Sequence, residues 1–386
     1  MTPTAPRGRI ERRAGAGVIR ELPALLRARG VRSCLLVTGG KSYVDSGAAS
    51  VEQLLNGIEV TRVAGIRPDP DLADLTPGVA RLRAAGVDAV IGIGGGSVLD
   101  YAKAITALAP QDHSPEESYT NGVRALVNER THLLVLVPTT AGTGSEVTSI
   151  AVLTVQGRKR SLHHPRLLAD IAVIDPALTL SVPPWITAST GADALSQAIE
   201  SYWSISSTDR SRRYALESMT LAAGHLQRAT GDGDLPARIA MSQAATLSGL
   251  AIDITQTTVP HALSYLLTTR FGVPHGHACG VFLRPVLDYN AGVGPADVAD
   301  PRGVRFVLAR IREITSCLRA AGAGDHPGAI DDLLRGAGLS MELTGFGVAV
   351  ADVDALVDAA MDSPRMTANP RYVPREALRE LVLARL

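Results

Sequence analysis

The sequence predicts an α/β N-terminal nucleotide-binding domain with a parallel sheet, followed by an all-α C-terminal domain. In the first half, apolar runs rich in β-branched residues alternate with helical patterns, as in parallel sheets buried on both faces. After residue 183 strand patterns become scarce, and segments with helical spacing run to the C-terminus. The double proline at Pro183 and Pro184 fits neither element type, which predicts domains at 1–182 and 183–386.

The elements of the first domain follow from where each pattern stops. Strands are predicted where apolar runs end at glycine or proline, at 33–40, 88–96, 132–140 and 169–176. Helices are predicted between them, including VIRELPALLRARG and DLADLTPGVARLRAAG, and the final glycine of the second suits a helix C-cap. The loops after parallel strands lie at one edge of the sheet, where such sheets bind ligands.

Composition excludes several classes of partner. The chain has 386 residues, 46% of them hydrophobic, which is enough for two buried cores. Basic and acidic residues balance at 38 each, so neither nucleic acid nor a membrane surface is expected as a partner. No apolar run reaches the roughly 18 residues of a membrane span. The three cysteines, without CxxC spacing, argue against disulfides and a cysteine-built zinc site, and a reducing cytoplasm fits best.

Two small-residue loops at predicted strand ends indicate a nucleotide site. VIGIGGGSVLDYAKAI carries the first, where free N–H groups at a helix start suit a pyrophosphate: Gly94, Gly95, Gly96 and Ser97. VPTTAGTGSEVT carries the second and offers the hydroxyls of Thr139 and Thr140. Either loop alone is also compatible with an ordinary tight turn, and GGGS is not the GxGxxG fingerprint. The two loops together favour a dinucleotide.

Two histidines and an aspartate form a candidate metal site. His261 and His275 lie fourteen residues apart, each beside a proline, and Asp193 lies upstream in a helical run. Such a set suits Zn²⁺ or Fe²⁺ and leaves a position open for substrate, which indicates a catalytic site. Gln197 follows Asp193 by four residues and so shares its helix face. Taken singly, Asp193 is equally compatible with a helix N-cap, and each histidine with an ordinary hydrogen-bonded residue.

Five segments in the same order resemble the iron-containing alcohol dehydrogenase family: GGGSVLDYAKAI, PTTAGTGSEVTSIAVLT, LADIAVIDPALT, GADALSQAIESYWS and HALSYLLTTRFGVPHGHA. The resemblance spans about residues 15–290. It implies an N-terminal nucleotide domain and a C-terminal helical domain, with NAD(P) and one divalent metal in the cleft between them. It also implies a homo-oligomer, a dimer or larger.

The family pattern is not matched at every site position. The family's metal ligands are Asp and His on one helix followed by two histidines; Asp193, His261 and His275 match, but Gln197 replaces the other histidine. An amide oxygen is a weaker donor than imidazole, so metal affinity is expected to fall. Tyr265 stands where many members have a further histidine near the substrate. Proton delivery to the alkoxide is then expected from Tyr265, His277, the ribose or water, although His277 is equally compatible with a lining role.

The coenzyme expectation rests on VTGGKSY, after the first predicted strand. Many NAD-dependent family members carry an aspartate here that binds the ribose and repels a 2′-phosphate. Glycines remove that charge, and the following lysine and serine suit the phosphate, so NADP(H) is favoured over NAD(H). The expected coenzyme-binding residues, the last matching a family lysine near the nucleotide, are Gly39, Gly40, Lys41, Ser42, Gly95, Gly96, Ser97, Thr139, Thr140, Thr148 and Lys159.

The reaction implied is hydride transfer from the nicotinamide to a metal-polarised aldehyde, giving a primary alcohol. DALSQAIESYWS and LTTRFGVPHGHA resemble the phosphonoacetaldehyde reductase branch, which makes 2-hydroxyethylphosphonate. Arg270 and Arg284 are candidates to bind the phosphonate, although both are equally compatible with ordinary exposed arginines. The alternatives are a general reductase of small aldehydes or ketones, a cyclase resembling dehydroquinate synthase, and a catalytically inactive nucleotide-binding scaffold with Gln197 as the lesion.

Overall fold

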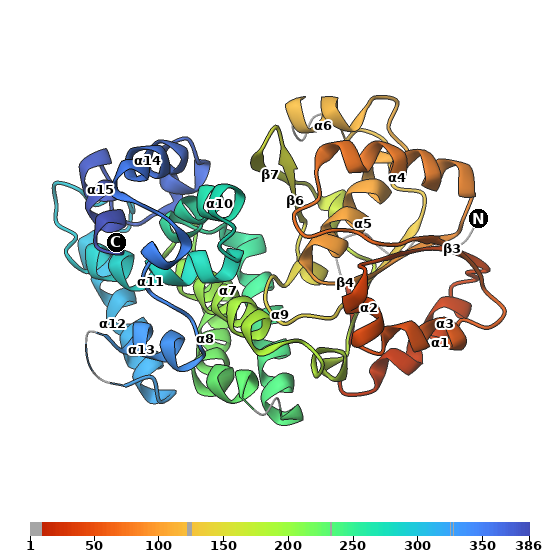
Figure 1. Cartoon of the computed structure of the whole chain (residues 1–386), viewed down its shortest axis with the longest axis horizontal. Helices are drawn as coiled ribbons and strands as arrows, with labels where there is room; N and C mark the ends of the chain where they lie inside the picture. The colour runs from red at the N-terminus through yellow and green to blue at the C-terminus, as the bar shows by residue number, and fades with distance from the viewer. Residues whose placement is uncertain (1–9, 122–125, 232–233, 325, 327) are drawn as a thin grey trace. The chain divides into compact units, whose positions relative to one another are not determined.

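The computed structural model describes residues 10–121, 126–231, 234–324, 326 and 328–386. The chain divides into two compact units (Figure 1). Unit 1 comprises Met1–Thr140 and Ser145–Val182, and unit 2 comprises Pro183–Leu386 together with the short segment Ala141–Gly144. The division therefore falls at the double proline, apart from four residues of the second small-residue loop.

Unit 1 contains a parallel sheet of the kind that the sequence predicts. The strands lie in the order β1-β8-β5-β4-β2-β3, and all neighbours are parallel. Their bounds are β1 (Glu11–Ala14), β2 (Ser33–Thr38), β3 (Glu59–Val63), β4 (Ala89–Gly94), β5 (Leu133–Pro138) and β8 (Ile171–Ile174). The sequence predicts the four central strands and misses the edge strands β1 and β3, because these carry charged, half-exposed residues instead of an apolar run.

Helices cover both faces of this sheet (Figure 1). One face packs Leu35 and Leu134 against α4 and α5, and the other packs Leu36 and Val135 against α1 and α3. Alternate strand residues thus serve two cores, as a sheet buried on both sides requires. The helices are α1 (Leu22–Arg27), α2 (Lys41–Asp45), α3 (Val51–Leu54), α4 (Leu72–Ala85), α5 (Gly96–Leu108) and α6 (Pro115–Asn121).

Capping residues define the two ends of α4. Unit 1 also contains a two-stranded hairpin. A capping box formed by Asp71 and Asp74 starts α4, and Gly86 ends it with φ of 57°, which confirms the predicted glycine cap. Strands β6 (Ile150–Val155) and β7 (Arg158–His163) pair antiparallel as a separate hairpin.

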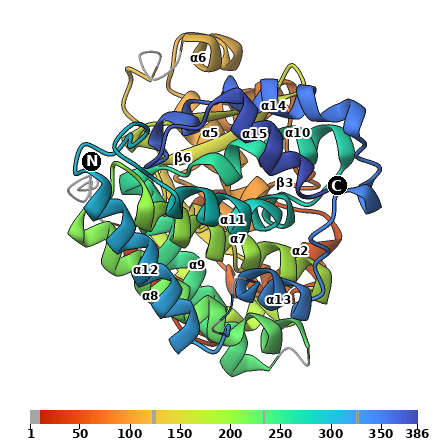
Figure 2. The same ribbon diagram turned by 90° about the vertical axis from the view of Figure 1, so that its left-hand side faces the viewer.

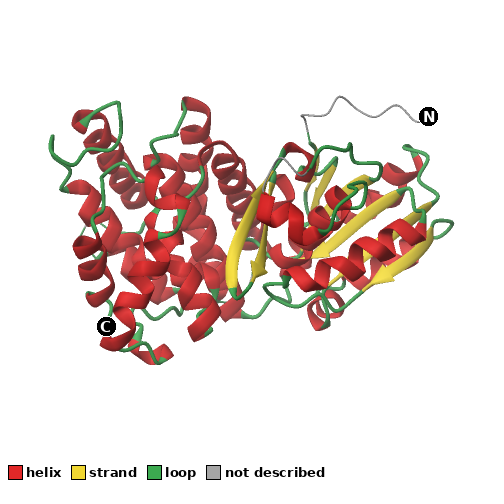
Figure 3. Cartoon of the chain, turned by 90° about the horizontal axis from the view of Figure 1, so that it is seen from above, coloured by secondary structure: helices red, strands yellow, loops and turns green. Residues whose placement is uncertain are grey.

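Unit 2 is helical, and no strand forms among its described residues (Figure 3). Its helices share one apolar core, in which α12 packs along α8 (Figure 2). The helices are α7 (Pro184–Trp203), α8 (Asp209–Thr230), α9 (Leu235–Thr255), α10 (Val259–Phe271), α11 (His275–Ala291), α12 (Val304–Ala320), α13 (Ala329–Gly336), α14 (Val353–Met361) and α15 (Arg375–Leu383). No helix in the described part of the chain has the length and apolar character needed to cross a membrane.

Candidate metal centre and nucleotide loops

Four side chains on three helices of unit 2 bring their donor atoms within 4.8 Å of one another: Asp193, His261, His275 and Cys279. Asp193 Oδ1 lies 3.3 Å from His261 Nε2 and 4.0 Å from His275 Nε2. Cys279 Sγ lies 4.0 Å from both ring nitrogens of His275. Two donors bound to one ion at about 2.0–2.3 Å each lie at most about 4.6 Å apart, so the cluster fits a single Zn²⁺- or Fe²⁺-sized ion after small adjustments.

A glycine brings two of these helices together. A Cβ at Gly276 would lie 1.9 Å from the carbonyl oxygen of Ser189 and 2.7 Å from Cβ of Asp193. Only glycine therefore lets the first turn of α11 pack against α7, and this contact places His275 beside Asp193. Pro274 precedes α11 as its N-cap, where a missing N–H costs nothing.

A buried carboxylate orients His261. Glu200 Oε1 lies 2.5 Å from His261 Nδ1, and Glu200 Oε2 accepts bonds from the Thr258 N–H (2.6 Å) and hydroxyl (3.0 Å). A bond from Nδ1–H to Glu200 would leave Nε2, which lies on the side of Asp193, to bind a metal, and this is the usual support of a metal-binding imidazole.

The charges around the cluster favour a cation. Burial alone lowers the pKa of His261, but Cys279, Glu200 and Asp193 together raise it well above its usual value. Burial raises the pKa of the Cys279 thiol, and His261 opposes that shift. These acidic groups would attract a metal ion for the same reason that they attract a proton.

Gln197, the residue predicted at the fourth ligand position, is buried on α7, and its Oε1 accepts a hydrogen bond from the Ser248 hydroxyl at 3.0 Å.

Two of the site's polar groups lie outside the predicted set. Cys279 and Glu200 were not predicted as site residues. A signal existed for both: Cys279 follows His275 by four residues and Glu200 follows Asp193 by seven, so each shares a helix face with a predicted ligand.

The two predicted proton donors have different surroundings. The Tyr265 ring lies 5.9 Å from the His275 ring, centroid to centroid, and so adjoins the cluster. His277 Nε2 lies 2.6 Å from the carbonyl oxygen of Ser340, and its ring meets Phe346 edge-on at 5.1 Å. Burial lowers the pKa of His277, against the effect of the Ser340 bond. Tyr265 is thus the candidate whose described contacts include a metal-site histidine.

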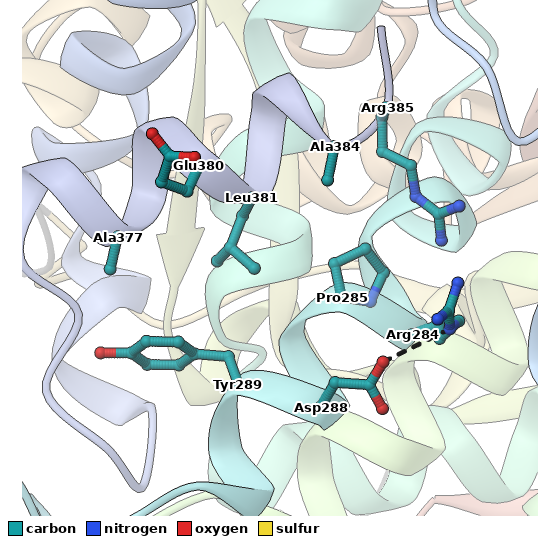
Figure 4. Close-up of a pocket in the computed structure, with 9 residues that line it drawn as sticks. All are labelled: Arg284, Pro285, Asp288, Tyr289, Ala377, Glu380, Leu381, Ala384 and Arg385. Carbon is teal, nitrogen blue, oxygen red and sulfur yellow. Dashed lines mark ion pairs between the residues drawn. The ribbon is translucent and has the colours of Figure 1, made fainter. Parts of the chain in front are cut away.

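The two arginines predicted to bind substrate form ion pairs within unit 2. Arg270 Nη2 lies 2.8 Å from Asp352 Oδ1. Arg284 lies 3.3 Å from Asp288 and 3.4 Å from Asp331. Arg284 also lines a pocket of about 460 Å³ between α11 and α15, in which an acidic side chain faces its guanidinium (Figure 4). Both cations are therefore already balanced by carboxylates.

The two predicted nucleotide loops of unit 1 lie side by side. Gly94 pairs with Pro138 at the ends of β4 and β5, and the Thr139 N–H donates to the Gly94 carbonyl at 3.0 Å. A Cβ at Gly95 would lie 3.4 Å from Thr140 Oγ1. Gly95 is the N-cap of α5, so the N–H groups of its first turn open at this strand end.

The remaining predicted coenzyme residues have mixed surroundings. Ser97 Oγ accepts a bond from the Asp69 N–H at 3.0 Å, and Lys159 Nζ pairs with Asp69 Oδ1 at 2.8 Å. The carbonyl of Gly39 accepts from Gly65 N, and that of Gly40 from Tyr43 N inside the turn that starts α2. The side chains of two residues at the start of α2 lie outside the described part of the structure: Lys41 and Ser42.

A buried lysine supports this edge of the sheet. Lys103 is fully buried on α5, and its Nζ donates to Ser145 Oγ (2.7 Å), Thr148 Oγ1 (3.0 Å) and the Ile150 carbonyl (2.9 Å). Asp100 lies 3.8 Å from the same ammonium. Burial raises the pKa of Asp100, and Lys103 opposes that shift. Thr148, a predicted coenzyme residue, therefore also helps to hold α5 against the loop after β5.

Comparisons with known proteins agree on one family. The model of the iron-containing alcohol dehydrogenases matches residues 11–176, and the model of the C-terminal part of that family matches residues 187–386. The chain is 38% identical to phosphonoacetaldehyde reductase of Streptomyces viridochromogenes over 82% of this chain and 81% of the relative. It is 33% identical to long-chain-alcohol dehydrogenase 1 of Geobacillus thermodenitrificans, over 92% and 89%. The structure of sulfoacetaldehyde reductase from Bifidobacterium kashiwanohense with NAD⁺ matches with a TM-score of 0.84 and 28% identity, over 100% and 98%.

Proposed function

Because the chain belongs to the iron-containing alcohol dehydrogenase family, we propose that it reduces phosphonoacetaldehyde to 2-hydroxyethylphosphonate with NADPH. Members of this family bind NAD(H) and a metal, and the chain is an enzyme of the alcohol dehydrogenase and aldehyde reductase class. The observation that carries the metal-assisted chemistry is the convergence of four donor atoms within 4.8 Å. The similarity to a phosphonoacetaldehyde reductase supports the choice of substrate.

The residues of unit 2 have different roles in the proposed reaction. Asp193, His261 and His275 would hold the metal, with Cys279 as a fourth donor. When bound, the metal supplies a Lewis acid for the carbonyl oxygen, and the coenzyme supplies the hydride. Glu200 keeps His261 in the tautomer that presents Nε2. Tyr265, beside His275, donates the proton that the product oxygen needs.

The residues of unit 1 hold the coenzyme in this proposal. The N–H groups at the start of α5 and the Thr139–Thr140 loop would bind the pyrophosphate. Gly39 and Gly40 put no acidic side chain at the end of β2, and this absence of negative charge at those two positions supports NADPH over NADH.

Two further substrate classes have specific support. The match to a sulfoacetaldehyde reductase favours another two-carbon aldehyde with a tetrahedral oxyanion. The match to a long-chain-alcohol dehydrogenase favours a general reductase of uncharged aldehydes. The first alternative shares the anionic group of phosphonoacetaldehyde, whereas the second lacks it.

Steady-state kinetics separate these candidates. The purified enzyme, loaded with Fe²⁺ or Zn²⁺, is assayed by NADPH or NADH oxidation with phosphonoacetaldehyde, sulfoacetaldehyde and propanal. We expect the highest kcat/KM with phosphonoacetaldehyde and NADPH. A higher kcat/KM with propanal would contradict the substrate, and a preference for NADH would contradict the coenzyme.

We also propose that the enzyme works as a cytoplasmic homodimer. Cys34, Cys279 and Cys317 are all free thiols, as expected in a reducing compartment. Light scattering after size exclusion tests the dimer, and a monomeric mass would contradict it. Fractionation of the source cells tests the location.

A further inference from the structure

We infer that Thr258 and Trp203 are positioning residues of the metal centre, because together they fix which nitrogen of His261 faces the ion. The inference rests on the metal site of the proposed function. Four buried side chains of unit 2 form one continuous chain of hydrogen bonds: Trp203, Thr258, Glu200 and His261. The chain starts at the end of α7 and returns to the first turn of α10.

The direction of these bonds follows from the indole. Its Nε1–H can only donate, and it donates to Thr258 Oγ1 at 2.9 Å. The threonine hydroxyl has one hydrogen of its own, which is directed to Glu200 Oε2 at 3.0 Å. The Thr258 N–H donates to the same oxygen at 2.6 Å. Two donors therefore hold Oε2 of the carboxylate in place.

The held carboxylate presents its other oxygen to the histidine. Glu200 Oε1 lies 2.5 Å from His261 Nδ1, so Nδ1 is the nitrogen that carries the hydrogen. The opposite nitrogen, Nε2, lies 3.3 Å from Asp193 Oδ1 and is left for the metal. Partners that orient a ligand in this way typically change metal affinity by about ten- to a hundredfold when they are removed.

Thr258 makes these contacts instead of its ordinary structural bond. It is the N-cap of α10, where a threonine oxygen usually accepts from an N–H of the first turn. Its side chain makes no such capping bond, and its oxygen accepts the indole N–H of Trp203. The hydroxyl thus serves the carboxylate and not the helix, which favours a role in the site over a role in helix stability.

The backbone just before Thr258 is strained. Gln256 follows α9 with φ of 69° and ψ of 166°, a region that residues other than glycine rarely adopt. Its side chain is exposed, so packing of that side chain does not explain the turn. Such conformations persist where the surrounding structure holds them, and they gather at functional sites. Here the turn presents the main chain and side chain of Thr258 to Glu200.

The first test measures Zn²⁺ affinity by competition with a chelator of known affinity. Thr258→Val keeps the shape and the N–H but loses the hydroxyl, and we expect the Kd for Zn²⁺ to rise about tenfold. Thr258→Ser keeps the hydroxyl and should stay within about twofold of the wild type. Thr255→Val is the matched control, since it removes a buried threonine hydroxyl that is bonded to Ser201 at 2.9 Å, and its Kd should stay unchanged. Thermal unfolding of the metal-free variants reports their folding.

The second test concerns the start of the chain. Trp203→Phe should raise the Kd for Zn²⁺ about threefold, because the hydrogen of the Thr258 hydroxyl is no longer directed to Glu200. Added to Thr258→Val, the same substitution should cause no further rise, because the indole acts through that hydroxyl. Losses that multiply in the double variant would overturn the inference.

The outcomes separate the inference from the proposed metal site. Unchanged affinity in Thr258→Val, equal weakening in Thr255→Val, or a Thr258→Ser variant as weak as Thr258→Val would each overturn the inference. If Thr258→Val does not fold, Trp203→Phe decides: weaker binding supports the inference, and unchanged binding overturns it. Equal Zn²⁺ binding by His275→Ala and the wild type would overturn the metal site and the inference with it. Weaker binding in His275→Ala but not in Thr258→Val would overturn the inference alone.

Discussion

The two units build their sites from different parts of the chain. At the nucleotide loops of unit 1, glycines and backbone N–H groups form the surface, and the buried charge of Lys103 is satisfied inside the unit. At the metal centre of unit 2, side chains from three helices converge, and their acidic groups favour a cation. In the proposed function, coenzyme binding and metal binding therefore depend on separate residues. Substitutions at one site are therefore expected to leave the other intact.

Removal of one metal ligand should have the largest effect. His275→Ala should lower kcat/KM about a thousandfold or more, because the carbonyl loses its Lewis acid. The Kd for NADPH, measured by fluorescence titration, should stay within about twofold, since the glycine loops are unchanged. Loss of coenzyme binding in this variant would show that the metal site and the coenzyme site are not independent. Wild-type activity in a metal-stripped preparation would contradict the metal-assisted mechanism.

The same difference between the two units explains which site residues can be predicted from the sequence. The nucleotide loops are contiguous motifs at the ends of apolar strands, so both could be located from the sequence. The metal centre joins residues up to 86 positions apart. The sequence predicts that Asp193, His261 and His275 converge, and the structure adds Cys279. Cys279 belongs to no CxxC pair, so cysteine spacing does not identify it as a ligand, although it lies one helical turn after His275. Glu200 shares the helix face of Asp193, but its contact is with His261 on another helix, and helical spacing does not predict that contact.

The packing of α11 on α7 gives the next prediction. Gly276→Ala should destabilise unit 2 by about 3 kcal/mol or more, because the new methyl group would overlap the Ser189 carbonyl oxygen. Thermal unfolding in the presence and absence of Zn²⁺ measures the loss, and bound metal should fall with it. Gly345→Ala is the matched control, since a Cβ there meets no atom within 4 Å. Equal melting temperatures for Gly276→Ala and the wild type would show that α11 lies farther from α7.

Substitution of Cys279, the fourth donor of the metal centre, should have a smaller effect. Cys279→Ser should weaken Zn²⁺ binding by about a hundredfold, since a hydroxyl is a much poorer zinc donor than a thiolate. In the Co²⁺-substituted protein, the near-ultraviolet thiolate-to-cobalt charge-transfer band should vanish in this variant. The band should persist in Cys317→Ser, whose sulfur contacts Thr220 on α8. A wild-type Co²⁺ protein without the band would show that the sulfur does not bind the metal.

Substitution of Gln197 should give the smallest change in metal affinity. Gln197→His should tighten Zn²⁺ binding by about tenfold, because imidazole is a better donor than an amide oxygen. The gain should stay modest because Cys279 is already within donor distance and because the new ring must give up the bond that Gln197 accepts from Ser248. Competition with a chelator of known affinity measures the change, and Ser248→Ala controls for the loss of the hydrogen bond alone. Unchanged affinity in Gln197→His would mean that residue 197 points to α9 and that unit 2 completes its metal centre with sulfur instead of the fourth side chain expected on α7.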